Sequence, residues 1–218
     1  MKNSVLNKTG LYVVLSVLLI NVSCSVALFP GYRNSTGTEV SDKPQSWFQP
    51  DSARFLFNTR VDVMKNHFSG ILVVKPIGRD TDRVVMITQM GLKVMDFEFY
   101  PSGDMKVYYI MDPMNRKVLI RTLKNDIGMV LMNYNDDSPV KLTEKKTGYP
   151  VYKYSQGCKK NYYVLAPGID KPVKARQIRG LSNKVHATFY GNEVTGIDSV
   201  NIEHYTINLS INLNRIIE

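Results

Sequence analysis

Alternating apolar and polar residues predict a strand-rich chain that contains one clear helix. Residues 54–63 alternate with a period of two, the pattern of a strand with one buried face. Three apolar strands are predicted next, at 71–75, 83–89 and 92–100, and a fourth at 105–111. In the third of these, Met95, Phe97 and Phe99 share one face, as expected where only one face of an antiparallel sheet is buried.

A helix is predicted after Asp112-Pro113, because aspartate caps free amides and proline fits the first helical position. At 100° per residue, six apolar side chains up to residue 131 fall within an arc of about 120°. They are Leu119, Ile120, Leu123, Ile127, Val130 and Leu131. We expect this apolar side to pack on the sheet.

Strand character returns after the helix. The predicted strands are 140–143, 151–155, 162–165, 173–178 and 184–190, and residues 205–213 alternate most clearly of all. About ten strands and one or two helices indicate an α+β fold. We expect a strongly curved antiparallel sheet, an incomplete β-barrel, with the helix on its concave face.

The amino terminus has the features of an export signal. Lys2 and Lys8 flank the start of an apolar run, Leu11–Ile20, which is too short for the roughly 20 residues that cross a bilayer. The run ends at Leu18–Cys24, which resembles a bacterial lipobox. The resemblance implies that Cys24 is diacylated and becomes the mature amino terminus. An ordinary cleaved signal and an uncleaved anchor remain as alternatives.

The residues around Cys24 predict the destination and the domain boundaries. Ser25 stands in place of the aspartate that retains lipoproteins in the inner membrane, so the resemblance implies sorting to the outer membrane, facing the periplasm. Residues 1–23 are then the signal peptide, 24–50 a flexible Pro- and Gly-containing tether, and 51–218 the folded domain. Trp47-Phe48 is either an interfacial anchor or a plug at the edge of that domain.

Candidate catalytic chemistry is sparse. Three histidines, His67, His186 and His204, are scattered, and no hydrolase, protease or CxxC motif occurs. Asp96 and Glu98 fit a solvated strand face better than a catalytic carboxylate pair. Cys158 is interpreted as a small, partly buried residue rather than a reactive thiol. We therefore expect no catalytic residue, no metal and no cofactor.

The chain is basic, with 28 Lys and Arg residues and a net charge of +9. Two of these residues lie in the signal peptide, which leaves 26 basic against 19 acidic residues. Much of the excess comes late: Lys141, Lys145, Lys146, Lys159, Lys160, Lys171, Lys174, Arg176, Arg179 and Lys184. Tyrosines are interleaved with them, at Tyr149, Tyr152, Tyr154, Tyr162 and Tyr163. Export argues against nucleic acid, so anionic lipid headgroups, an envelope protein or solubility alone remain as explanations.

From about residue 52 to 214 the pattern resembles the LolA/LolB-like lipoprotein carrier superfamily. The closest matches are residues 68–75, 83–88, 91–99 and 115–117. The resemblance implies a half-barrel whose hydrophobic interior accepts acyl chains. The expected cavity-lining residues are Phe55, Phe57, Met95, Phe97, Phe99, Leu119, Leu123, Ile127, Leu131, Leu209 and Ile211. The family pattern includes a loop with an exposed leucine that contacts the membrane. In this sequence the corresponding turns offer only Ile77 and Met90, which are the predicted membrane contacts.

Two functions of different class follow. The first is a monomeric outer-membrane lipoprotein, anchored by its lipid, that binds lipid or the acyl chains of lipoproteins. The second is a non-catalytic structural or interaction lipoprotein that acts through its basic, tyrosine-bearing late strands.

Overall fold

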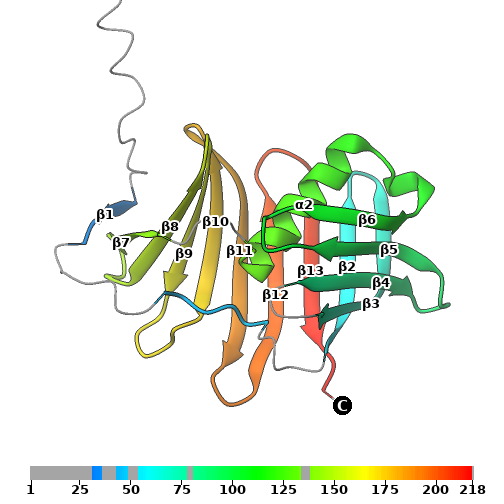
Figure 1. Cartoon of the computed structure of the whole chain (residues 1–218), viewed down its shortest axis with the longest axis horizontal. Coiled ribbons are helices and arrows are strands. Elements are labelled where there is room, and N and C mark those ends of the chain that lie inside the picture. Colours follow the sequence, from blue (N-terminus) through cyan, green and yellow to red (C-terminus); the bar gives the residue numbers. More distant parts are fainter. Residues whose placement is uncertain (1–30, 36–42, 49–53, 78–80, 134–137, 218) are drawn as a thin grey trace, which may run out of the picture. The chain divides into compact units, whose positions relative to one another are not determined.

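Thirteen strands form one sheet in the computed structural model, which describes residues 31–35, 43–48, 54–77, 81–133 and 138–217. The strand order is β1-β7-β8-β9-β10-β11-β12-β13-β2-β3-β4-β5-β6 (Figure 1), and the paired strands are antiparallel. The predicted signal peptide and Cys24 lie outside the described residues.

One meander builds the β2 to β6 side of the sheet. Its strands are β2 Phe55–Val63, β3 Asn66–Pro76, β4 Asp82–Thr88, β5 Lys93–Phe99 and β6 Met105–Ile110. Alternate residues of β2 are buried, from Phe55 to Val63, which confirms the period-two prediction. The β3 strand has Gly70 where it faces Thr88 of β4, and the two backbones approach closely there.

A second meander builds the remaining strands except β1 (Tyr32–Asn34) and returns to the first. Its strands are β7 Val140–Glu144, β8 Pro150–Gln156, β9 Lys159–Leu165, β10 Pro172–Arg179, β11 Ser182–Asn192, β12 Gly196–His204 and β13 Leu209–Arg215. The two meanders join where β13 pairs with β2, with Ile211 opposite Val61. The predicted alternation at 205–213 is therefore a strand only from Leu209, and Tyr205 and Ile207 lie in an exposed turn.

The single α-helix among the described residues, α2 (Lys117–Leu131), carries the chain between the two meanders. It runs across the strands in Figure 1. The predicted start at Asp112-Pro113 is instead a short 3-10 turn, Asp112–Met114, and α2 begins after Arg116 without a side-chain cap. The helix ends at Leu131 and is capped by Met132, whose backbone is left-handed at φ 58°.

The fold is mostly β, which corrects the predicted α+β class. The sheet has thirteen strands where about ten were expected, and it is neither closed nor strongly curled. In the part of the chain that the structure describes, the end strands β1 and β6 do not pair with each other, so no hydrogen bonds between them close a barrel. The strand direction turns across the open sheet (Figure 1), the accumulated twist that many paired strands produce.

Parts of the predicted tether lie in the folded unit. Residues Tyr32–Asn34 form β1, which pairs with β7. Trp47 and Phe48 are 3% and 5% exposed and belong to the hydrophobic core. The Trp47 indole donates a hydrogen bond to the Pro172 carbonyl at 2.8 Å. This pair is therefore a plug of the folded unit, one of the two interpretations of the sequence.

Candidate functional site

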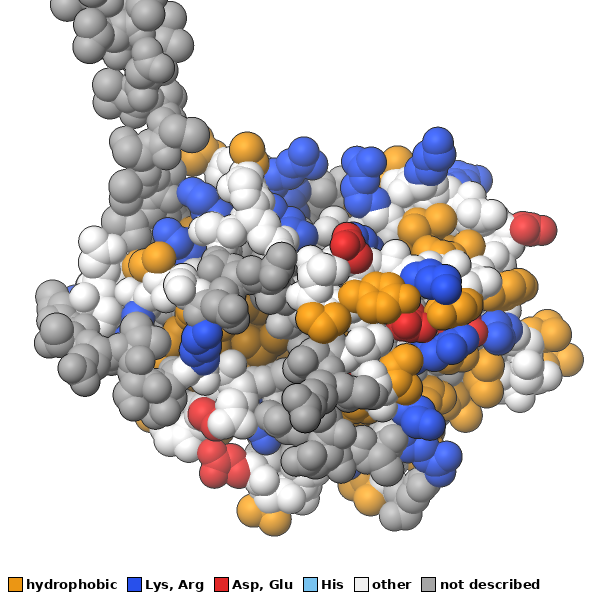
Figure 2. Space-filling model, viewed as in Figure 1, with side chains coloured by type: hydrophobic (Ala, Val, Ile, Leu, Met, Phe, Trp, Pro, Cys, Tyr) orange, Lys and Arg blue, Asp and Glu red, His pale blue; other side chains and the backbone are white. Residues whose placement is uncertain are grey.

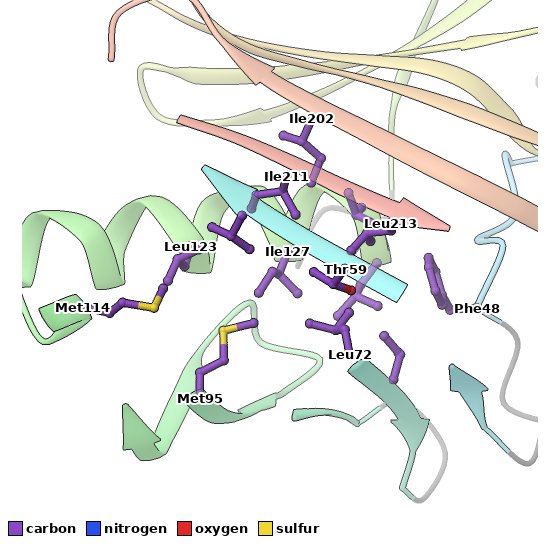
Figure 3. Close-up of a pocket in the computed structure, with 14 residues that line it drawn as sticks. Phe48, Thr59, Leu72, Met95, Met114, Leu123, Ile127, Ile202, Ile211 and Leu213 are labelled. Carbon is purple, nitrogen blue, oxygen red and sulfur yellow. The ribbon is translucent and has the colours of Figure 1, made fainter. Parts of the chain in front are cut away.

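The candidate site is the apolar interface between α2 and the middle of the sheet. Residues opposite one another in neighbouring strands point to the same face, so Ile202, Ile211, Val61 and Leu72 lie on the side of the sheet that packs against α2. We name this side the helix face and the other side the outer face. Side chains from α2 and from five strands converge there (Figure 3).

A small cavity lies at the centre of this interface. Thirteen of its lining side chains are apolar and one, Thr59, is polar. The lining residues are Phe48, Thr59, Val61, Leu72, Val74, Met95, Met114, Leu123, Ile127, Val130, Leu131, Ile202, Ile211 and Leu213. The cavity measures about 20 Å³, a space of the order of one water molecule. The helix and sheet are therefore packed together, with no room for an acyl chain while α2 stays in place.

All eleven predicted cavity residues belong to the hydrophobic core, with Leu119 only partly buried. Five of them line the cavity: Met95, Leu123, Ile127, Leu131 and Ile211. The other six pack elsewhere in the core. Strand alternation marked the buried faces correctly, but it could not say which of those faces α2 would cover.

Sequence reasoning missed nine lining residues, although some carried a usable signal. Thr59 and Val61 share the predicted buried face of the first long strand with Phe55 and Phe57. Ile202 shares its face of β12 with Val200. Phe48 and Met114 come from turns, where no periodicity could point to them.

Polar contacts attach α2 to the rest of the domain near its carboxyl end. The Tyr163 hydroxyl on β9 donates to the Met129 carbonyl at 2.8 Å, and Lys159 donates to the Asn125 side chain at 2.9 Å. The Ser46 hydroxyl donates to the Leu131 carbonyl at 3.1 Å. The first residues of the helix, Lys117 and Val118, are exposed.

A further contact near this end of the helix joins Asp126 of α2 to His204 of β12. The carboxylate and the imidazole Nε2 are 2.8 Å apart, and the two side chains are 1% and 6% exposed. Burial raises the pKa of Asp126 above its ordinary value, although His204 and Lys159 act to lower it. The second carboxylate oxygen has no hydrogen-bond partner among the described residues. This pair fixes the position of α2 on the sheet.

A second buried polar contact joins two neighbouring strands, where Gln177 of β10 donates to Asn161 of β9 at 2.9 Å. Asp126 carried a weak sequence signal, because it falls only about 20° outside the apolar arc of the helix. His204 carried none.

Ile77 and Met90, the predicted membrane contacts, do not form one surface. Met90 is 89% exposed in the turn between β4 and β5, whereas Ile77 is half-buried and follows β3. The two residues stand at opposite ends of β4, whose seven residues extend over roughly 23 Å. Cys24, the predicted lipidation site, lies outside the described residues.

Asp96 is buried, in contrast to the solvated strand face predicted for it. Its carboxylate accepts hydrogen bonds from Arg83 at 2.9 and 3.1 Å and from Lys93 at 2.9 Å. The hydrogen bonds from Arg83 hold the pKa of Asp96 below its ordinary value. Asp96 is thus held by two cations on the outer face, an arrangement that stabilises the fold.

Four of the five late tyrosines are also buried: Tyr152, Tyr154, Tyr162 and Tyr163. They form part of the core or pack against β1 and do not offer an exposed aromatic surface. Lys and Arg side chains nevertheless outnumber acidic ones on the face seen in Figure 2.

Within the described ranges, no three His, Cys, Asp or Glu side chains gather where they could hold a metal ion. None of the helices in this part of the chain has the length and apolarity needed to cross a bilayer. Cys158 is an exposed free thiol, which corrects its predicted partial burial.

Comparison with known proteins finds similarity in structure alone. No family model matches the sequence, and no curated protein matches it. A domain from Vibrio parahaemolyticus assigned to outer membrane lipoprotein sorting is similar at 10% identity and a TM-score of 0.43, over 78% of this chain and 84% of that one. A DUF1329 family protein from Desulfovibrio piger ATCC 29098 is similar at 8% identity and a TM-score of 0.42, over 76% and 85%. TM-scores of this size support no conclusion about family or activity.

Proposed function

We propose that the protein is a non-catalytic lipoprotein of the outer membrane, anchored at Cys24 and facing the periplasm. In this proposal it binds one acyl chain of a lipid or of a lipoprotein between α2 and the helix face of the sheet. The observation that carries the proposal is the chemistry of the interface, where thirteen of fourteen lining side chains are apolar. A ligand held there is recognised by its hydrocarbon.

Binding requires α2 to move, because the cavity of about 20 Å³ does not admit a chain. Its contacts to Tyr163, Lys159, His204 and Ser46 all involve helix residues from Asn125 to Leu131. Before Lys124, whose ammonium lies 3.6 Å from the Asp104 carboxylate, α2 makes no such contact among those described, and this amino-terminal part is the one that would swing away. The cost of exposing apolar side chains is offset when hydrocarbon takes the place of the helix.

The methionines at the interface suit this exchange. Met95 and Met114 line the cavity, and Met86 and Met129 are fully buried in the same core. Unbranched thioether side chains adopt new rotamers readily, so they can fill the cavity or make room for a chain.

The experiment is native mass spectrometry of the full chain with Cys24→Ser, purified after incubation with membrane lipid. This variant removes the covalent acyl groups, so every acyl species observed is bound non-covalently. We expect one acyl species per chain, and higher occupancy in Leu123→Ala, because that change enlarges the cavity. Ile71→Ala, which shortens a side chain on the outer face, serves as the matched control.

Absence of bound acyl species from both the parent and Leu123→Ala would refute lipid binding at this interface. If acyl occupancy rose equally in Leu123→Ala and Ile71→Ala, the binding would be due to a general loosening of the fold.

The alternative function is partner binding through the late strands. Tyrosine side chains contribute little to it, because four of the five late tyrosines are buried. Its basic part remains, and on the outer face it includes Lys174 and Arg176.

A further inference from the structure

A second and much larger cavity lies on the outer face of the sheet. It measures about 290 Å³, close to the lower end of the size range of small-molecule sites. Its walls come from β1, β7, β9, β10 and β11 and from the turn after β12. The side chains on these walls are mixed in charge, in contrast to the apolar cavity beneath α2.

Strand register places the cations of this cavity side by side. Arg176 of β10 stands opposite His186 of β11 and opposite Tyr162 of β9. Two residues earlier on the same face, Lys174 stands opposite Thr188. Directly opposite side chains in antiparallel strands have Cβ atoms roughly 5 Å apart. Two permanent cations and a hydroxyl therefore border one side of the cavity.

The opposite side of the cavity carries an acid and aromatic rings. Glu144 of β7 pairs in register with Tyr32 of β1, and both line the cavity. The Tyr32 ring stacks on Tyr162 at 4.9 Å between centroids, which fixes its orientation. Burial raises the pKa of the Tyr32 hydroxyl, so this group stays protonated as a hydrogen-bond donor.

His186 and Tyr205 complete the wall. Their ring centroids are 5.1 Å apart, and His186 Nε2 lies 3.4 Å from the Glu203 carboxylate. His186 Nδ1 is buried without a hydrogen-bond partner among the described residues. An unsatisfied buried polar atom beside a cavity is a place where a bound molecule or water can supply the missing bond.

We propose that this outer-face cavity binds a zwitterionic group in which a phosphate is joined to an ammonium. Arg176 and Lys174 receive the phosphate, because Arg and Lys are the side chains that bind phosphate oxygens most strongly. Glu144 and the faces of Tyr32 and Tyr205 receive the ammonium, by charge and by cation-π attraction. The volume fits such a group without long acyl chains. The inference is independent of lipid binding beneath α2, on the other face of the sheet.

A simple anion fits the cavity less well. Glu144 lines the same space, and a ligand that is only negative would face its carboxylate. A ligand with both charges satisfies both walls. The group has two sources: the headgroup of a phosphatidylethanolamine lipid, or a water-soluble phosphate ester.

Calorimetric titration of the full chain tests the proposal, with phosphoethanolamine and the short-chain lipid dihexanoyl phosphatidylethanolamine as probes. We expect saturable binding of at least one probe, weakened at least tenfold by Arg176→Gln and by Lys174→Gln. Lys174 is exposed, so Lys174→Gln is not expected to unfold the protein. Lys75→Gln, an exposed cation on the outer face of β3, is the matched control and should bind as the parent does.

Glu144→Gln separates the two halves of the ligand. It should weaken phosphoethanolamine binding and strengthen the weaker binding of inorganic phosphate, because the repelling carboxylate is removed. Binding of the lipid probe alone identifies the source as a headgroup, and equal binding of both probes identifies the phosphate ester. Absence of saturable binding of either probe would overturn the proposal. An equal loss of probe affinity in Lys174→Gln and Lys75→Gln would overturn it too.

Discussion

Asp126 of α2 and His204 of β12, separated by 78 residues in the sequence, are joined by a 2.8 Å contact beneath the helix. The two side chains are almost fully buried. This contact connects the crossover helix to the second meander, so it determines where α2 lies on the helix face. Its protonation state should therefore affect both stability and the position of the helix.

The first prediction concerns Asp126→Asn. Burial raises the pKa of Asp126 above the unfolded value near 3.8, so the folded state holds a proton more tightly there. The stability from this group is present below pH 3.8 and is lost as the pH rises through the raised pKa. Asp126→Asn removes the cost of a buried charge. We expect it to raise the free energy of unfolding at pH 7, because burial disfavours the charged carboxylate.

Urea unfolding of the parent and Asp126→Asn at pH 4 and pH 7 measures this difference, which should narrow at the lower pH. A variant clearly less stable than the parent at pH 7 would show that attraction to His204 outweighs the cost of burial.

The second prediction concerns the attachment of α2 by Tyr163. Tyr163→Phe removes the hydrogen bond to the Met129 carbonyl and leaves the ring in place. We expect a loss of about 1 kcal/mol in the free energy of unfolding. Hydrogen exchange of the α2 amides should become faster. Tyr190→Phe, in which the parent side chain is 57% exposed, should change neither quantity.

The third prediction concerns acid sensitivity through Asp96. Arg83 and Lys93 hold the pKa of Asp96 below its unfolded value of 3.8, so its contribution to stability is present above that pH. The contribution is lost as the pH falls through the folded pKa. Asp96→Asn should cost about 1–3 kcal/mol at pH 7 and much less at pH 2.5.

Chemical unfolding at the two pH values tests this dependence. Asp104→Asn is the control, because the Asp104 side chain is 76% exposed and lies 3.6 Å from Lys124. If Asp104→Asn cost as much as Asp96→Asn, burial of the Asp96 ion pair would not be the cause.

The fourth prediction compares two glycines. A Cβ at Gly70 would overlap the Ile87 carbonyl oxygen of the neighbouring strand, so Gly70→Ala must push β3 and β4 apart. We expect a loss of roughly 1–3 kcal/mol. A Cβ at Gly128 of α2 would meet only the Phe99 ring, at 4.0 Å, so Gly128→Ala should stabilise the protein by up to about 1 kcal/mol. Thermal unfolding of both variants should show shifts of opposite sign.

The fifth prediction concerns the amino terminus, for which the sequence is the only guide. If Cys24 carries the lipid, Cys24→Ser should move the protein from the membrane fraction to the soluble fraction of the cell envelope. Fractionation followed by immunoblotting gives the result, and Cys158→Ser is the control. Firm membrane association of Cys24→Ser would contradict lipid anchoring at this residue.

The sequence by itself determined which residues are buried in most of the strands and where α2 ends. Alternation in β2 and the apolar arc of the helix were reliable because one-sided burial leaves a period in the sequence. The eleven predicted cavity residues are accordingly core residues. Late tyrosines such as Tyr162 and Tyr163 gave no such guidance, because the residue type alone does not show whether a tyrosine is buried or exposed.

Only the tertiary structure decided the strand order, the openness of the sheet and the meeting of Asp126 with His204. Backbone hydrogen bonds between strands are the same for almost any sequence. The alternation of apolar and polar residues therefore does not determine which strands pair. Curvature depends on the twist summed over thirteen strands and on whether the end strands pair. The filled interface beneath α2 depends on the volumes of side chains from six elements and two turns, which come together only in the folded protein.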